Sequence, residues 1–267
     1  MNFLRWNEIQ VLTFFFVLVR VSSMLAFLPL LGDRTIPANI KILFGLALSF
    51  VVFPLLWSGG VRVDYKVFNS TSQTIWVITS EVSFGILVGF VSRWIFDAVQ
   101  VAGHVAGTSI GFSMASVLDP HTETQNIALA ELQYILVALL FLSMDGHHVF
   151  LSAILKSFEV APLAAINFFA NTESVAQYLI QMSAEVLLLG VKLCAPILVV
   201  ILLLNLAMGI MARAVPHMNV LAVSFSVNIL VGLLVVLVSL PGFLSLVGST
   251  FDVYMPELFR FMRLFGG

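Results

Sequence analysis

The chain of 267 residues is too apolar for a water-soluble protein, because 60% of its residues are hydrophobic and 10% are charged, against about 25% charged residues in a typical soluble domain. This composition excludes a soluble enzyme, a soluble nucleic-acid-binding domain and a disordered chain. A net charge of −2 and a single cysteine leave no basic surface for nucleic acid and no internal disulfide. We therefore expect an integral membrane protein or a subunit of an assembly held at a membrane.

Long apolar runs predict an all-α fold with about six long apolar helices. A membrane-spanning helix needs about 20 mostly apolar residues, whereas a membrane barrel shows alternating segments of about ten. In chain order, the strong runs cover residues 9–31, 40–57, 74–101, 127–144, 175–213 and 220–247. A weaker run, 149–169, contains Lys156, Glu159 and Pro162 and predicts an extra helix or a re-entrant segment.

Ionisable residues interrupt several of these runs. Each charge at the centre of a lipid-exposed helix costs about 2.5–3.5 kcal/mol, so these side chains must face protein or water. Two interpretations stay open: buried ion pairs that hold helices together, or a polar path for a transported species. The residues concerned are Arg20, Glu81, Arg93, Asp97, Glu185, Lys192 and Arg213.

One polar and small-residue stripe recurs every four positions in the third run. Glu81, Gly85, Gly89, Arg93 and Asp97 share one face of the expected helix. The two glycines allow a neighbouring backbone to approach closely. The stripe therefore predicts a packed helix contact with charges at both ends.

A segment of small residues follows the third run, and we expect it to form a central loop over residues 103–125. Asp119 and Pro120 end any helix there, since the residue before a proline is pushed out of the α region. The loop is either an ordinary connection or a plug that seals a narrow opening. The residues that would form the plug are Gly107, Ile110, Gly111, Phe112, Ser113, Met114, Val117 and Leu118.

The sequence contains no recognisable catalytic motif, so we predict no enzyme activity, no cofactor and no metal site. The segment Asp145–Gly146–His147–His148 is expected to be a turn between two helices. Adjacent histidines on a helix point about 100° apart, which makes a poor metal-binding pair.

The most distinctive stretch covers residues 205–219. It places Asn205, Gly209 and Arg213 on one helix face and then breaks the helix at Pro216. We expect Arg213 to be buried near this break. The stretch closely resembles the corresponding segment of the FliR family of flagellar type III export proteins, and the resemblance extends over nearly the whole chain. Other matching residues are Arg20, Pro29, Gly32, Pro37, Glu81, Gly85, Gly89, Gly111–Ser113, Asp119–Pro120 and Gly146–His148.

The resemblance implies a subunit of the flagellar export gate in the bacterial inner membrane, at the flagellar basal body. FliR proteins join FliP and FliQ in a helical pore for unfolded flagellar proteins, with FlhB around the assembly and FlhA beneath it. By this resemblance, residues 1–174 form FliP-like hairpins, 175–250 a FliQ-like helix pair and 251–267 a tail. It also implies that residues from about Gly107 to Pro120 plug the pore. The expected surroundings are these partners and membrane lipid, with no nucleic acid.

Three alternatives remain at this point: the equivalent injectisome subunit, a structural scaffold without pore contact, and a stand-alone secondary transporter. In the transporter, Glu81, Arg93, Asp97, Glu185 and Lys192 would line a solute or proton path. Transporters often contain internal repeats with paired broken helices. The two halves of this sequence show no such repeat, which weighs against that alternative.

Overall fold

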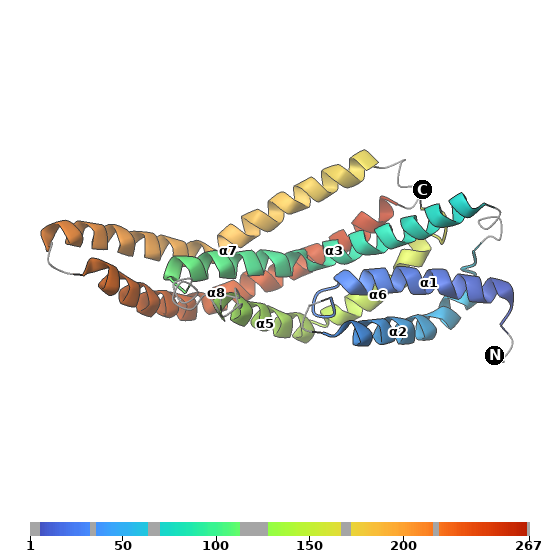
Figure 1. Cartoon of the computed structure of the whole chain (residues 1–267), viewed down its shortest axis with the longest axis horizontal. Helices are drawn as coiled ribbons and strands as arrows, with labels where there is room; N and C mark the ends of the chain where they lie inside the picture. Colours follow the sequence, from blue (N-terminus) through green and yellow to red (C-terminus); the bar gives the residue numbers. More distant parts are fainter. Residues whose placement is uncertain are drawn as a thin grey trace. The chain divides into compact units, whose positions relative to one another are not determined.

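The computed structural model describes residues 6–32, 36–63, 70–112, 128–166, 172–215 and 219–265. Every regular element within these residues is a helix, which confirms the predicted all-α fold (Figure 1). The helices are α1 (Glu8–Phe27), α2 (Ala38–Ser58), α3 (Thr71–Ile110), α5 (Ala128–Ser143), α6 (Gly146–Val160), α7 (Thr172–Ala214) and α8 (Val220–Arg263). Five of them are long and apolar enough to cross a membrane, or six spans if α5 and α6 together count as one, in agreement with the predicted number.

The third apolar run forms a longer helix than the sequence predicts. Helix α3 continues past Val101 to Ile110, so residues 103–110, which were expected to belong to the central loop, are helical. The small residues there serve close helix packing: a Cβ added at Gly103 would lie 2.5 Å from Cα of Ala130 on α5. Of the remainder of the expected loop, Gly111 and Phe112 are described and residues 113–125 lie outside the described residues.

The last helix also exceeds its predicted length. Helix α8 continues past Val247 to Arg263, so most of the expected tail, 251–267, is helical. Leu258, Phe261 and Met262 are buried at helical spacing. The ring of Phe261 lies 5.0 Å from that of Tyr178 on α7. These contacts stabilise the last turns of α8, where the sequence is less apolar than in the preceding run.

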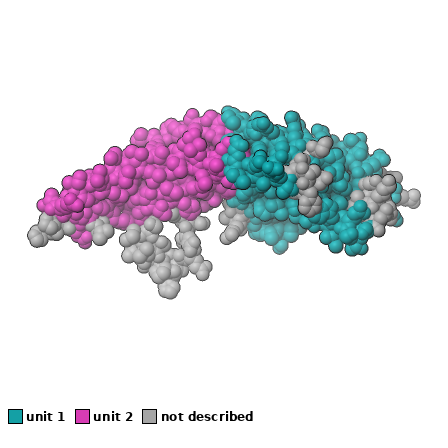
Figure 2. Space-filling view, turned by 90° about the horizontal axis from the view of Figure 1, so that it is seen from above, with its two compact units in different colours: residues 1–94, 145–181, 252–267 teal, residues 95–144, 182–251 magenta. Residues whose placement is uncertain are grey.

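The chain forms two compact units, coloured separately in Figure 2. Unit 1 comprises residues 1–94, 145–181 and 252–267, and unit 2 comprises residues 95–144 and 182–251. Helices α3, α7 and α8 each contribute residues to both units. In unit 2, three buried rings from α3, α5 and α8 form an aromatic core: Phe96, Phe141 and Phe251 have centroid separations of 5.4–5.8 Å.

In unit 1, α1 and α2 form a hairpin (Figure 1). Asn7 begins α1 with a capping box, in which its side chain accepts from the backbone N–H of Gln10 and its own N–H donates to Oε1 of Gln10 (2.9 Å). The Asn7 side chain also accepts from the backbone N–H of Glu8 (2.8 Å). Trp6 stacks on Phe53 of α2 at 5.0 Å. The two helices are thus joined by an aromatic contact at the start of α1.

Helix α1 also packs closely on α3, and two glycines make this possible. A Cβ added at Gly85 would overlap the hydroxyl of Ser23. A Cβ added at Gly89 would lie 2.7 Å from the backbone oxygen of Met24 and 2.8 Å from Cβ of Phe27. The first half of the predicted stripe therefore packs against α1 of the same chain.

We expect Gly89→Ala to destabilise the chain by about 1–3 kcal/mol, because the added methyl group meets a backbone atom that cannot rotate away. The measurement is thermal unfolding of the full-length chain in detergent micelles. Gly209→Ala is the matched control, since nothing lies within 4 Å of a Cβ added there. Equal stability of the two variants would contradict the close approach of α1 to α3.

Candidate functional site

The candidate site centres on a fully buried ion pair between two helices of unit 1. Nε of Arg20, on α1, donates to Oε2 of Glu81, on α3, at 2.5 Å, and both side chains have zero exposure to solvent. Charges buried this deeply are costly unless they are paired and hydrogen-bonded. The pair therefore depends on its further partners.

Those partners come from the end of α6 and the turn after it. Nη1 of Arg20 donates to the backbone oxygens of Ser157 (3.0 Å) and Ala161 (2.7 Å). The last carbonyl groups of a helix lack helical partners and carry partial negative charge, so they suit a cation. Oε1 of Glu81 accepts from the N–H of Ala164 at 3.0 Å. The network thus joins α1, α3 and α6.

Two aromatic rings enclose the guanidinium group. Its central carbon lies 5.0 Å from the ring centroid of Phe84 and 4.6 Å from that of Phe158. Cation–π attraction gains strength where water is excluded. For Arg20 and Glu81, the structure therefore favours the first interpretation of the mid-helix charges, which is a buried ion pair that holds helices together.

The predicted stripe divides into two parts. Glu81, Gly85 and Gly89 are buried and contact α1 or the segment after α6. Arg93 and Asp97 are only half-buried, and they belong to unit 1 and unit 2 respectively. The buried part of the stripe is a contact within the chain rather than a surface for another subunit.

Four of the eight predicted plug residues belong to the described part of the chain. Gly107 and Ile110 are buried in α3, and a Cβ added at Gly232 of α8 would lie 2.6 Å from Cγ1 of Ile110. Gly111 ends the helix with a φ of +111°, a conformation that favours glycine, and Phe112 follows it half-buried. Gly107 and Ile110, which were predicted to belong to the plug, thus lie in helix α3 and pack within unit 2. Ser113, Met114, Val117 and Leu118 lie outside the described residues.

The predicted interface residues of α7 are all exposed within this chain. Oδ1 of Asn205 accepts from Nδ2 of Asn228 on α8 at 2.9 Å, a polar contact between two apolar helices. Gly209 has open space where a Cβ would point. Arg213 is exposed, so its expected burial is wrong for the single chain, in which no described element covers the end of α7. Pro216 lies outside the described residues.

Comparison with known sequences decides the family. Residues 11–253 match the model of the family described as bacterial export proteins, family 1. The chain belongs to this family. Its relatives include several flagellar biosynthetic proteins FliR. The Escherichia coli protein is 27% identical over 82% of this chain and 81% of its own length, and the Bacillus subtilis protein is 27% identical over 95% of each. The Aquifex aeolicus protein is 28% identical over 92% of this chain and 90% of its own length.

Like the composition, the surface of this export-family chain is apolar. Helix α2 and the unit 2 segments of α7 and α8 carry many exposed large hydrophobic side chains. Exposed apolar patches of this extent mark contact with lipid or with other proteins. Examples are Ile42, Leu43, Val51 and Leu55 on α2, Leu202, Leu206 and Ile210 on α7, and Leu230, Leu237 and Val238 on α8.

The sequence did not reveal the partners of Glu81 and Asn205. A charge inside an apolar helix needs an opposite charge, and this rule makes Arg20 a candidate partner for Glu81. The two residues are 61 positions apart, however, and other ionisable residues in the apolar runs meet the same rule equally well. Asn228 gave no comparable signal, because a single asparagine in an apolar run has no defined partner type.

Among the described residues, one group could hold a metal ion. Asp145, His147 and His148 are exposed at the start of α6, with one potential ligand atom each, all within 4.8 Å of one another. The prediction that this segment makes no metal site therefore stays a prediction.

We expect Arg20→Met to lower the free energy of unfolding by about 3–5 kcal/mol, because it leaves a buried carboxylate without its cation. The double variant Arg20→Met/Glu81→Gln should be more stable than Arg20→Met alone, since the uncompensated charge is gone. Thermal unfolding of Arg20→Met, Glu81→Gln, the double variant and the wild type gives the double-mutant cycle. Lys192→Met, which removes an exposed cation from α7, is the control. Strictly additive effects of the two substitutions would contradict the pairing.

A smaller effect is expected for the asparagine contact. Asn228→Ala should destabilise the chain by about 0.6–2 kcal/mol, the range for hydrogen bonds between helices in membranes. Ser239→Ala is the control, because the Ser239 hydroxyl donates only to Val236 of its own helix. An Asn205→Ala/Asn228→Ala cycle with zero coupling would show that the two side chains do not interact.

Proposed function

We propose that the chain is a non-enzymatic subunit of the flagellar type III export gate in the bacterial inner membrane, at the base of the flagellum. The observation that carries the proposal is the likeness of residues 11–253 to bacterial export proteins, several of which are flagellar biosynthetic proteins FliR. The long apolar helices support the membrane location. Residues 1–174 would correspond to the FliP-like hairpins and 175–250 to the FliQ-like helix pair.

The proposed partners are FliP and FliQ, which form the pore with this chain, and FlhB and FlhA, which contact the assembly. The exposed apolar side chains of α2, α7 and α8 support this part of the proposal, because they need lipid or protein to cover them. Gly209 offers an exposed face without a side chain, onto which a neighbouring helix can pack closely. Arg213, one helical turn further, would find its hydrogen-bond acceptors in such a partner.

Arg20 and Glu81 have a supporting role in this mechanism. By joining α1, α3 and the end of α6, the network would keep unit 1 rigid while an unfolded flagellar protein passes through the pore. Glu81 was also a candidate for the transport path of a secondary transporter. Zero exposure to solvent, together with its hydrogen bonds to Nε of Arg20 and to the N–H of Ala164, makes Glu81 unsuitable for a path that a solute must enter.

The proposed plug begins where α3 ends and returns to the helical bundle at α5. Ile110 against Gly232 fixes its first end, and Gly111 allows the chain to leave the helix. Met114, Val117 and Leu118 would supply apolar contacts that seal the pore. Such contacts are individually weak and non-directional, so an incoming polypeptide can replace them.

To test the proposal, the chain is co-expressed with FliP and FliQ, and a variant lacking residues 113–120 is prepared in parallel. Both should co-purify with the two partners, because the deletion leaves the described helices intact. After reconstitution into lipid bilayers, the deletion variant should conduct ions while the wild-type complex stays closed.

Gly209→Leu is the matched assembly variant, and it should reduce co-purification without lowering the thermal stability of the chain. The proposed function would be contradicted if the co-expressed wild-type chain is recovered only as a stable monomer that carries neither FliP nor FliQ. If the complex with the deletion variant stays closed to ions, the proposed plug is contradicted but the proposed assembly is not.

A further inference from the structure

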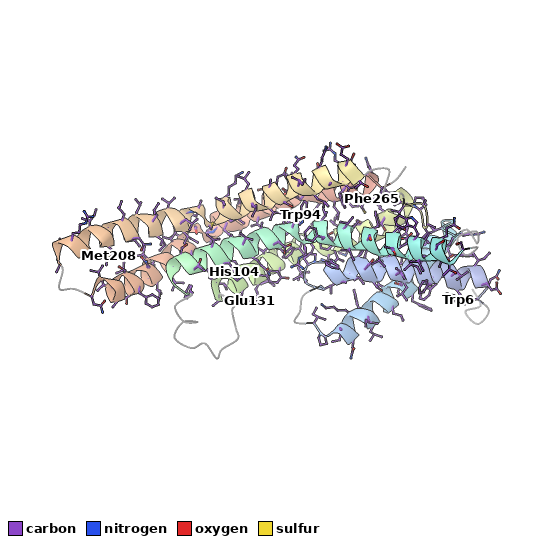
Figure 3. All side chains as sticks on the ribbon, turned by 45° about the horizontal axis from the view of Figure 1, so that its top comes forward. Trp6, Trp94, His104, Glu131, Met208 and Phe265 are labelled. Carbon is purple, nitrogen blue, oxygen red and sulfur yellow. The ribbon has the colours of Figure 1, made fainter. Side chains whose placement is uncertain are left out.

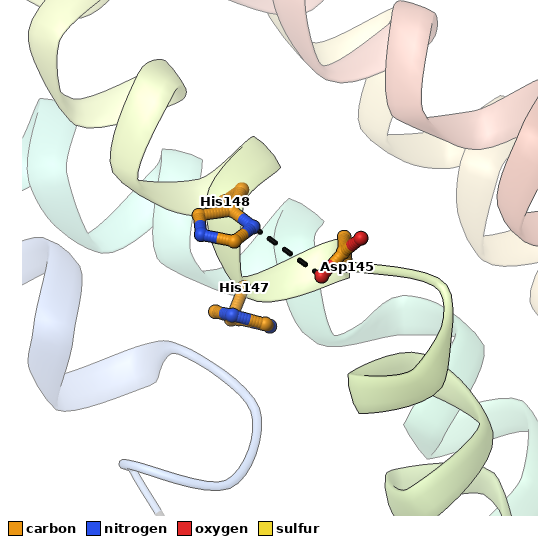
Figure 4. Close-up of side chains that lie close together, drawn as sticks. All are labelled: Asp145, His147 and His148. Carbon is orange, nitrogen blue, oxygen red and sulfur yellow. Dashed lines mark ion pairs between the residues drawn. The ribbon is translucent and has the colours of Figure 1, made fainter.

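A cluster of three potential metal ligands lies at the start of α6, outside the network around Arg20. Figure 4 shows the side chains of Asp145, His147 and His148 side by side. Nδ1 of His148 lies 3.4 Å from Oδ1 of Asp145, and the two imidazole rings have centroids 4.2 Å apart. The three side chains project from two residues of the first turn and the residue just before it.

The spacing of the ligand atoms suits a small divalent ion. Zinc binds imidazole nitrogen and carboxylate oxygen at about 2.0–2.2 Å, which places the ligand atoms of one site about 3–4 Å apart. One ligand atom from each residue lies within 4.8 Å of the others. The side chains of His148 and Asp145 are 67% and 76% exposed, so small rotations of unhindered side chains close the remaining distance.

The backbone of Asp145 explains why adjacent histidines and the carboxylate converge. Asp145 occupies the N-cap position of α6 but adopts a left-handed conformation, with φ 56° and ψ 25°, and its side chain makes no capping hydrogen bond. An aspartate at this position ordinarily accepts from the N–H groups of the first turn. Here the carboxylate turns to His148 instead and remains available as a ligand (Figure 4).

The carboxylate also makes the start of α6 more favourable for a cation. The start of a helix carries partial positive charge, which disfavours a cation. The negative charge of Asp145 offsets it, and neutral imidazoles are the commonest ligands for zinc, nickel and copper. A site of two histidines and one aspartate therefore has the composition of a transition-metal site rather than of a magnesium or calcium site.

We propose that Asp145, His147 and His148 bind one divalent transition-metal ion, with zinc as the probe that suits the ligand set. Three protein ligands leave at least one coordination position open to water or to a group from another chain. The ion would fix the first turn of α6 to the residue before it. Because the other end of α6 supplies the carbonyl groups that hold Arg20, the ion would stabilise unit 1 through this helix.

The experiment uses the full-length chain, purified in detergent with an affinity tag that contains no histidine and stripped of metal with a chelator. Zinc is titrated in by calorimetry, and thermal unfolding is recorded with and without it. We expect one zinc ion per chain and a higher unfolding temperature with zinc, since a ligand that binds only the folded state stabilises it.

His148→Gln and Asp145→Asn should each weaken zinc binding by about tenfold or more, because even the groups that orient metal ligands contribute factors of about 10–100. His104→Gln is the matched control: His104 is exposed on α3 and belongs to no such cluster among the described residues (Figure 3). Size-exclusion chromatography verifies that the variants fold.

The proposal is overturned if the wild type binds no zinc, if the two cluster variants bind as tightly as the wild type, or if His104→Gln weakens binding equally. None of these readouts involves protein export or assembly with partners. A negative result for zinc binding therefore does not contradict the proposed function. Likewise, a negative result for the proposed function does not contradict the metal site.

Discussion

A guanidinium group without access to water is the constraint on which unit 1 depends. Arg20 is fully buried, so its charge must be compensated within reach of its own side chain. Glu81 supplies the opposite charge, the end of α6 supplies two carbonyl oxygens, and two phenylalanine rings supply the remaining contacts. Because these groups come from three helices, the contacts of one side chain fix the positions of α1, α3 and α6.

The glycines of α3 follow from the same constraint. Gly85 and Gly89 lie one and two turns beyond Glu81 on the face that carries the ion pair. They let the backbone of α1 approach α3 at the distance that the short link between Arg20 and Glu81 requires. Charge and small side chains therefore specify the same helix contact. A different packing of these helices would separate the ion pair. The unpaired buried charges would then strongly destabilise that alternative arrangement.

The segments of α7 and α8 that belong to unit 2 contrast with the charged network of unit 1. A polar contact joins them, between Asn205 and Asn228, and they direct large apolar side chains and the bare face of Gly209 outward. A surface of this kind is unsuitable for water and suitable for lipid or for other apolar helices. A chain that is rigid around buried charges in unit 1 and apolar on the outside of unit 2 fits a member of an assembly, as its membership of an export family indicates.

The sequence by itself determined the all-α class, the number of long apolar helices and the family. Apolar run lengths suffice for the first two, because the hydrogen bonds of a helix are local and the length of the run sets its span. Only the tertiary structure decided which residues meet. Gly103 and its small neighbours are as compatible with a loop as with close packing on Ala130. The sequence therefore left the end of α3 undecided, and the packing of α3 against α5 decided it. Arg20 and Glu81 pair across 61 positions, and Asp145, in its left-handed conformation, lies within 4.8 Å of a ligand atom of each histidine. The packed chain sets both arrangements, since one is a contact between distant residues and the other depends on a local backbone turn.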